Sequence, residues 1–187
     1  MRSRRQTPHR HYIPVVFYVP EGKTENIYIN RLKELKLCKP DLRILYSKPS
    51  NSSVKALIDK AKTITAELKD NDVIWILIDE DTESHTALQM DNLEKWSHDS
   101  PQHFFALSVP RFETCLLMHF VENPKTRDVQ SDSAVSRHIP GYSRSKSCSL
   151  HCIDSDRVRV AQERMRRCSS TSQTRSGFYK FLDAVLI

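Results

Sequence analysis

The sequence lacks any apolar run that approaches the roughly 20 residues a helix needs to cross a bilayer. Its first residues are basic, but Pro8, His9 and His11 follow where a secretory signal would carry an apolar core. The five cysteines are odd in number and scattered, which is not the pattern of a disulfide framework. We therefore expect a cytoplasmic protein with reduced thiols and no contact with membranes.

The chain also lacks the first glycine of a nucleotide-binding P-loop. Gly22-Lys23-Thr24 has the composition of the end of such a loop, but Phe17 stands where the first glycine is required. Glu21 would in addition bring a negative charge to the phosphates. We do not expect a P-loop, although Lys23 is a candidate phosphate contact, with an ordinary solvated lysine as the alternative.

Charge is spread unevenly over the 187 residues. Residues 131–187 carry ten Lys and Arg against five Asp and Glu, a balance of +5, while residues 1–130 carry nineteen against eighteen, a balance of +1. We divide the chain into a basic tail (1–11), one α/β domain (12–130) and a basic extension rich in Ser and Arg (131–187) whose last helix packs on the domain. A basic periphery suits a polyanionic substrate, and a merely solubilising surface is the alternative.

Strand and helix patterns alternate along the first two thirds of the sequence. The expected strands are residues 12–19, 42–46, 73–78 and 103–108, and the expected helices are residues 24–37, 54–68, 88–96, 112–120, 157–168 and 177–187. Thr24 is the expected N-cap of the first helix, and Ser52 or Ser53 that of the second. The alternation predicts an α/β fold with a mainly parallel central sheet flanked by helices, and a site at the carboxyl ends of the strands.

Acidic residues stand where two of these strands end. Glu21 follows the first, and Asp79 and Asp81 follow the unbroken apolar run 73–78. Because neighbouring parallel strands end at one edge of a sheet, these carboxylates are expected to converge, and such close like charges require a proton or a shared cation. We predict a site for Mg²⁺ or Mn²⁺ held by Asp79 and Asp81, with Glu21 as the proton-transferring group. A solvated turn at the strand end is the alternative for the Asp pair.

The turn after the fourth strand reaches the same edge. Glu113 is a candidate metal ligand there, or simply an acid that favours a helix N-terminus, and Arg111 is a candidate phosphate contact. His119 lies in an apolar run and is either a substrate contact or a hydrogen-bonded core histidine.

A later turn combines an aromatic residue with two cations. Tyr142, Arg144 and Lys146 are candidates for nucleic-acid contacts through stacking and phosphate binding, with an ordinary polar loop as the alternative.

Five segments, in this order, resemble the RloB-like family, whose members are regarded as Toprim-fold proteins. They are EGKTE at 21–25 with Tyr28 behind it, DED at 79–81, PRFETCLLMHF at 110–120, HIPGYSRSK at 138–146 and TRSGFYKFL at 174–182. The resemblance implies that Glu21 is the general acid or base of phosphodiester chemistry and that Asp79 and Asp81 bind the metal. The sequence departs from the family pattern at Val109, where Asn is usual, and at Cys115, where Trp is usual.

These observations lead to three functional hypotheses. The first is a magnesium-dependent nuclease of the Toprim type, for which the resemblance implies antiphage defence, a partner ATPase of the AAA or ABC type, and RNA such as tRNA rather than DNA as substrate. The second is a non-catalytic subunit that binds nucleic acid or the ATPase. The third is nucleotidyl transfer, as in primases. The sequence leaves the oligomeric state open, a homo-oligomer included.

Overall fold

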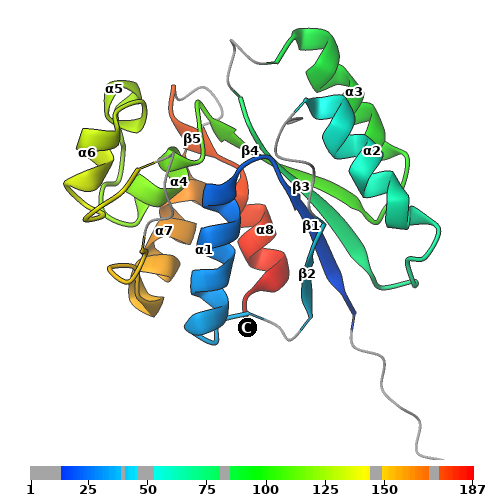
Figure 1. The fold of residues 1–187 in the computed structure, drawn as a ribbon, viewed down its shortest axis with the longest axis horizontal. Helices are drawn as coiled ribbons and strands as arrows, with labels where there is room; N and C mark the ends of the chain where they lie inside the picture. Colours follow the sequence, from blue (N-terminus) through cyan, green and yellow to red (C-terminus); the bar gives the residue numbers. More distant parts are fainter. Residues whose placement is uncertain (1–13, 39–40, 46–52, 81–84, 144–148, 169–172) are drawn as a thin grey trace, which may run out of the picture.

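The computed structural model describes residues 14–38, 41–45, 53–80, 85–143, 149–168 and 173–187 (Figure 1). The strands are β1 (Val16–Pro20), β2 (Leu42–Ile44), β3 (Val73–Asp79), β4 (His103–Val109) and β5 (Arg175–Ser176). The helices are α1 (Lys23–Glu34), α2 (Val54–Thr65), α3 (Ala87–His98), α4 (Glu113–Met118), α5 (Thr126–Val129), α6 (Asp132–Ser136), α7 (Ser155–Arg167) and α8 (Phe178–Val185).

The strands form one sheet in the order β2-β1-β3-β4-β5. The first four are mutually parallel, and β5 joins β4 antiparallel through Ser108 and Val109. The predicted α/β class and mainly parallel sheet are confirmed. Parallel pairing brings the carboxyl ends of β1, β3 and β4 to one edge, which we call the rim of the sheet.

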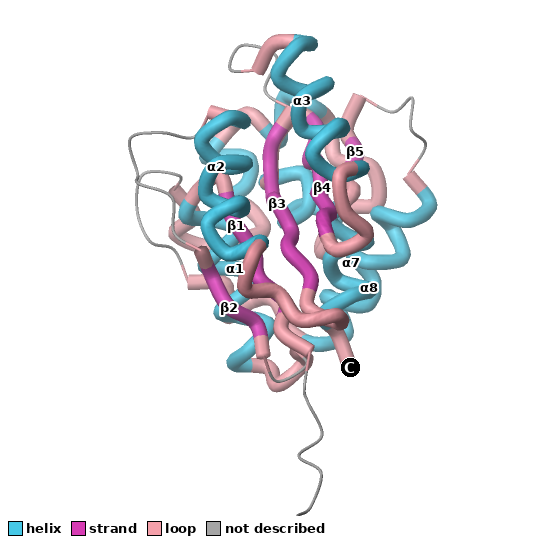
Figure 2. The backbone as a smooth tube through the Cα atoms, turned by 90° about the vertical axis from the view of Figure 1, so that its right-hand side faces the viewer, coloured by secondary structure: helices cyan, strands magenta, loops and turns pink. Residues whose placement is uncertain are grey.

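Helices cover both faces of the sheet. In Figures 1 and 2, α2 and α3 lie on one face and α1, α7 and α8 on the other. Alternation along β3 supplies both layers: Ile74, Ile76 and Ile78 pack with α2 and α3, whereas Trp75 and Leu77 pack with the opposite helices. Burial on both faces explains why β3 reads as an unbroken apolar run.

Capping residues set where the helices begin. Ser53 caps α2 through a hydrogen bond from the Ala56 N–H, as one of the two predicted serines. The prediction for α1 was wrong by two residues, because Gly22 rather than Thr24 is the N-cap. A Cβ at Gly22 would lie 3.0 Å from Glu25 Oε2, so the glycine makes room for that carboxylate.

Two short helices, α5 and α6, and the two-residue strand β5 lie in or beside the Ser- and Arg-rich stretch where no such elements were expected. Ser131 caps α6 and leaves Ala134 and Val135 buried in the core. The residues after Val121 therefore contribute to the same core as the sheet. The division into a domain and an extension remains a prediction.

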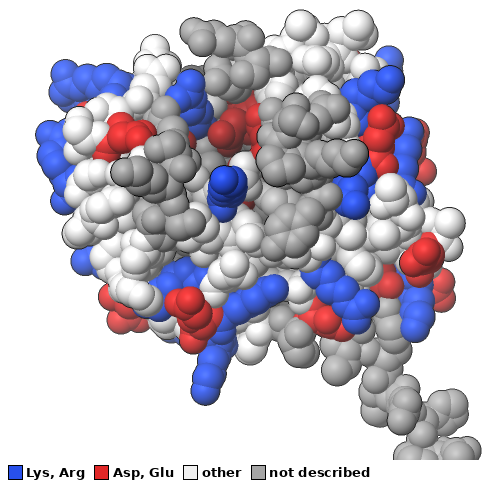
Figure 3. All heavy atoms as spheres, viewed as in Figure 1, with Lys and Arg blue, Asp and Glu red and all other residues white. Residues whose placement is uncertain are grey.

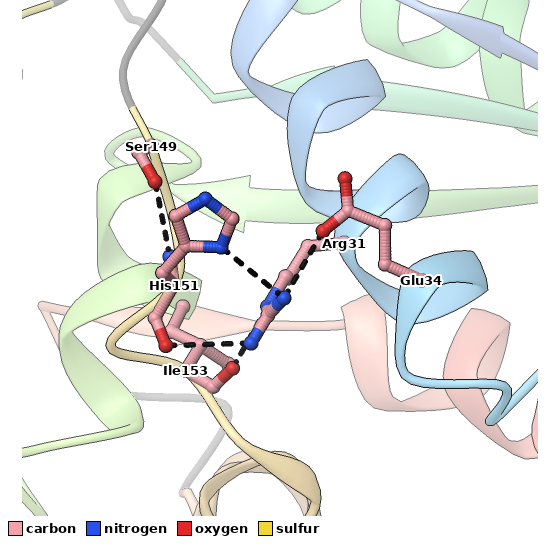
Figure 4. Close-up of polar contacts among 5 residues, drawn as sticks. All are labelled: Arg31, Glu34, Ser149, His151 and Ile153. Carbon is pink, nitrogen blue, oxygen red and sulfur yellow. Dashed lines mark hydrogen bonds and ion pairs between the residues drawn. The ribbon is translucent and has the colours of Figure 1, made fainter.

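Arg31 on α1 ties this later part of the chain to the first helix (Figure 4). Its guanidinium donates to the carbonyls of Ile153 at 3.0 Å and His151 at 3.3 Å, and to the Glu34 carboxylate at 3.0 Å. The bonds fix the backbone that leads into α7, 120 residues from Arg31 in sequence.

Candidate active site

The rim brings Glu21 and Asp79 together through the backbone. The Glu21 N–H donates to the Leu77 carbonyl at 2.9 Å, which extends the β1–β3 pairing by one residue. Glu21 Oε2 then accepts the Asp79 N–H at 2.8 Å. The two strands on which these acids were placed from the sequence are thus neighbours, and one carboxylate is held by the peptide of the other.

His85 is a second contact of the Glu21 carboxylate. Its Nε2 lies 3.3 Å from Glu21 Oε1, and its side chain is 3% exposed. The other ring nitrogen, Nδ1, is buried and has no hydrogen-bond partner among the described residues. Sequence patterns do not single out His85, since a lone histidine after an acidic turn has many uses.

Glu25 is a carboxylate of the site to which sequence reasoning gave no role. It stands in the first turn of α1, is 3% exposed, and its Oε1 accepts the Gly22 N–H at 3.3 Å. Burial, with the nearby negative charges of Glu21 and Glu113, raises the pKa of Glu25 from 4.5 to about 8.

Asp79 is the carboxyl group on which the charges of the other site acids act together. Burial raises the pKa of Asp79 well above its usual range, and the carboxylates of Glu25, Glu21 and Glu113 raise it further. Arg111 acts in the opposite direction. Four carboxyl groups therefore share one partly buried electrostatic environment at the rim, with one guanidinium opposing them, and removing a proton from any of them increases the repulsion.

Glu113 and Tyr142 are joined by a buried hydrogen bond from the Tyr142 hydroxyl to Glu113 Oε1. Tyr142 is buried, so its ring is not a surface for base stacking as it stands. Glu113 begins α4, where a carboxylate also favours the helix dipole. The structure thus gives Tyr142 a role in orienting an acid of the site.

The donor set suits a hard cation, since carboxylate oxygens are the ligands that Mg²⁺ and Mn²⁺ prefer. Among the described residues, no group of three or more His, Cys, Asp or Glu side chains is already arranged to hold a metal ion. Asp81, a predicted ligand, lies outside the described residues. Asp79 is the member of the predicted metal-binding pair that the described residues include.

His119 lies in the core. It is 2% exposed, its Nδ1 is 3.0 Å from the Cys115 carbonyl, and its Nε2 is 2.9 Å from the Tyr28 hydroxyl. Because a carbonyl only accepts, Nδ1 carries the proton and Nε2 accepts from Tyr28. Burial lowers the pKa of His119 from 6.5 to about 4, so the ring is neutral at pH 7. These contacts favour the core-histidine alternative over a phosphate contact.

We expect Tyr28→Phe to lower the free energy of unfolding by about 1–3 kcal/mol, because it leaves His119 Nε2 buried without its donor. Urea unfolding at pH 7 measures the change. Tyr179→Phe is the matched control, since the hydroxyl of this half-buried tyrosine has no hydrogen bond to any described residue. Equal stability of the two variants would show that the Tyr28–His119 bond contributes nothing.

The other predicted contacts are distributed as follows. Lys23 is exposed at the first position of α1, beside the rim. Glu80, the middle acid of DED, pairs with Arg175 of β5 at 2.9 Å, which links the third and fifth strands at the rim. Arg144 and Lys146 lie outside the described residues.

Surface charge is mixed on the face that Figure 3 shows. Lys and Arg side chains alternate there with Asp and Glu side chains and do not form one continuous basic surface. The predicted basic periphery is therefore not a single patch on this face.

The comparisons with known proteins add one result. The model of the family described as RloB-like protein matches residues 16–181, which includes every described element from β1 to the middle of α8. The chain belongs to the RloB-like family. No curated protein and no solved structure gives a significant match. The α/β architecture of this RloB-like chain is consistent with a Toprim-like fold, and no described helix is long and apolar enough to cross a membrane.

Proposed function

We propose that this RloB-like chain is a metal-dependent nuclease of the Toprim type that hydrolyses phosphodiesters, with RNA as its substrate class. The observation that carries the proposal is the pairing of Glu21 with the Asp79 peptide inside a cluster of four carboxyl groups. Membership of the family supports the proposal through the expectations attached to its motifs.

Each residue has a defined part in this proposal. Glu21 has one oxygen fixed by the Asp79 N–H and the other facing His85, so Oε1 is the atom that takes or gives a proton. Asp79, with Asp81, would hold a Mg²⁺ or Mn²⁺ ion, which when bound offsets negative charge on the phosphate. Arg111, near Asp79, and Lys23 bind and orient the phosphate. Tyr142 holds the Glu113 carboxyl in place, and Glu25 holds the α1 end of the site.

The proposal also includes a biological role, a partner protein and a cellular location. Antiphage defence and an ATPase partner of the AAA or ABC type follow from the resemblance of the motifs, as does action in the cytoplasm. If the ATPase gates the nuclease, the isolated chain will be slow and the mixture of both proteins fast.

The test is a cleavage assay on tRNA, single-stranded DNA and duplex DNA with Mg²⁺, Mn²⁺ or EDTA, with and without a candidate partner ATPase of the AAA or ABC type. We expect tRNA cleavage that EDTA abolishes and that Asp79→Asn lowers by about 100-fold or more, because one metal-binding oxygen becomes an amide. Asp59→Asn, a change of an exposed carboxylate on α2, is the matched control and should cleave as wild type does.

Two results would end the proposal. Folded wild-type protein that cuts none of these substrates under any metal or partner condition would favour the non-catalytic subunit. Incorporation of nucleoside triphosphates into product without hydrolysis would favour nucleotidyl transfer.

A further inference from the structure

The described residues leave the outer edge of β4 open over most of its length. β5 pairs only with Ser108 and Val109, after which the chain turns into α8. On the other edge, the Ile74 N–H bonds to the Gln102 carbonyl and the Glu80 N–H to the Ser108 carbonyl. Even-numbered residues of β4 therefore direct their backbone groups to β3, and odd-numbered residues direct theirs outward.

Two of the outward-facing residues differ in their backbone hydrogen bonds: Leu107 has a partner, and Phe105 has none among the described residues. The Leu107 carbonyl accepts the Gly177 N–H at 2.7 Å, and a Cβ at Gly177 would come within 3.3 Å of that carbonyl. Phe105 has no hydrogen bond on this side to any described residue. Its N–H and C=O are the pair that an added strand would use.

A groove of about 500 Å³ runs along this open edge, and we call it the β4 groove. Its lining includes the end of α3, the length of β4, the end of α7, β5 and the start of α8. Phe104 projects into solvent with 38% of its surface exposed and stacks on Trp75, with ring centroids 5.0 Å apart and planes at 19°. A large exposed aromatic on an open strand edge is a feature that isolated proteins usually avoid.

Two buried nitrogens of groove-lining residues have no hydrogen-bond partner among the described residues. They are Trp75 Nε1 and His103 Nε2, in side chains that are 5% and 7% exposed. His103 Nδ1 lies 3.1 Å from the Trp96 carbonyl and so carries a proton, because a carbonyl only accepts. Buried polar atoms without a hydrogen-bond partner are costly in a core.

The charged residues that line the groove all have one sign. Lys180 is exposed and Arg175 is half-buried, and none of the described lining residues is Asp or Glu. Arg175 also pairs with Glu80 at 2.9 Å, so Lys180 is the stronger attraction for an anion.

We infer that the β4 groove binds an extended peptide segment of a protein partner, which adds to the sheet as a strand beside Phe105 and carries both apolar and acidic side chains. Main-chain hydrogen bonds to an open edge give such binding its affinity, and pockets for alternate side chains give it specificity. Phe104 and Trp75 offer the apolar contact, and Lys180 the contact for a carboxylate. This site is separate from the carboxylate cluster and does not rest on the proposed nuclease function.

Two other occupants fit less well. A second copy of the chain paired edge to edge through β4 would bring a second Lys180 and Arg175 to the same groove, and like charges would repel. A nucleic-acid strand could stack on Phe104, but its phosphodiester backbone cannot match the alternating N–H and C=O groups of Phe105.

The experiment is a selection of displayed random peptides of about six residues, the usual strand length, on the full-length protein. Peptides that also bind the double variant Phe104→Thr, Lys180→Glu are removed. We expect the enriched sequences to alternate apolar residues and to hold more Asp and Glu than Lys and Arg. The most enriched peptide is then synthesised and its binding to the protein is measured by fluorescence anisotropy. It should slow amide hydrogen exchange at Phe105, and each single variant should weaken its binding by about tenfold.

Two controls make the result specific. The synthesised peptide with N-methyl groups on alternate residues, which cannot form the strand pairing, should not bind. Lys55→Glu, a charge reversal on α2, should bind the peptide as wild type does.

Several outcomes would overturn the inference. These are no enrichment, enriched peptides without acidic residues, and binding that survives N-methylation. Protection of Phe105 by a single-stranded RNA but not by the peptide would assign the groove to nucleic acid. A dimer that forms with concentration and is lost in Phe104→Thr would assign it to a second copy.

Discussion

Glu21→Gln lowers the rate of metal-dependent phosphodiester cleavage by about 100-fold or more while the protein stays folded. The glutamine carbonyl can still accept the Asp79 N–H that Glu21 Oε2 accepts at 2.8 Å, so the connection between β1 and β3 at the rim persists. The amide cannot take up a proton, so general base catalysis is lost without loss of structure. The initial rate of cleavage of the preferred substrate measures the effect.

The matched control for this variant is Glu67→Gln, which makes the same chemical change on an exposed side chain after α2. It should cleave at the wild-type rate, and both variants should unfold at the same temperature as wild type to within a few degrees. Undiminished cleavage by Glu21→Gln would remove Glu21 from the chemistry. That result would favour the alternative in which the carboxylate cluster is structural and the chain is a non-catalytic interaction subunit.

The apolar run of β3 and the acids at its end allowed both the sheet and half of the candidate site to be predicted. Residues 73–78 have no alternation because helices cover both faces, and the parallel sheet was predicted from strands that alternate with helices along the chain. Once β1 and β3 were expected as neighbours, the meeting of Glu21 and Asp79 followed from where each strand ends. Hydrogen bonding between Glu21 and the Asp79 peptide agrees with that prediction.

The rest of the site depends on contacts that leave no local pattern. Glu25 looks like an ordinary first-turn acid of α1, and only the packing of that helix against the rim buries it. Tyr142 reaches Glu113 across 29 residues from a Pro-Gly turn whose composition predicts a polar loop. β5 is two residues long, too short for any periodicity, so the open edge of β4 was also invisible in the sequence.

Glu25→Gln weakens the pH dependence of stability between pH 6.5 and 8 when divalent cations are absent. In the folded protein, burial raises the pKa of Glu25 from 4.5 to about 8, so the folded state keeps a proton that the unfolded chain has already lost. Stability from this group is complete below pH 4.5 and is lost as pH rises toward 8. Asp79, whose pKa is also raised, acts in the same direction.

Above pH 6.5, the pH dependence of stability that comes from Glu25 can be distinguished from that of His119. Because burial lowers the pKa of His119, that residue costs stability only as pH falls from 6.5 toward 4. Between pH 6.5 and 8, the contribution of Glu25 to the free energy of unfolding should therefore fall by about 2 kcal/mol, at about 1.4 kcal/mol for each pH unit. Glutamine cannot ionise, so the variant should lack this contribution and keep that of Asp79.

Urea unfolding in EDTA at several pH values measures both slopes, and Glu67→Gln, an exposed acid, should follow wild type. Adding Mg²⁺ or Mn²⁺ should stabilise wild type more at pH 8 than at pH 6.5, because a cation offsets the carboxylate repulsion that deprotonation creates. Equal slopes in wild type and Glu25→Gln would show that the proton held by the folded protein resides elsewhere in the cluster. A metal effect independent of pH would show that the cation does not bind at these carboxylates, which would also weaken the assignment of Asp79 as its ligand.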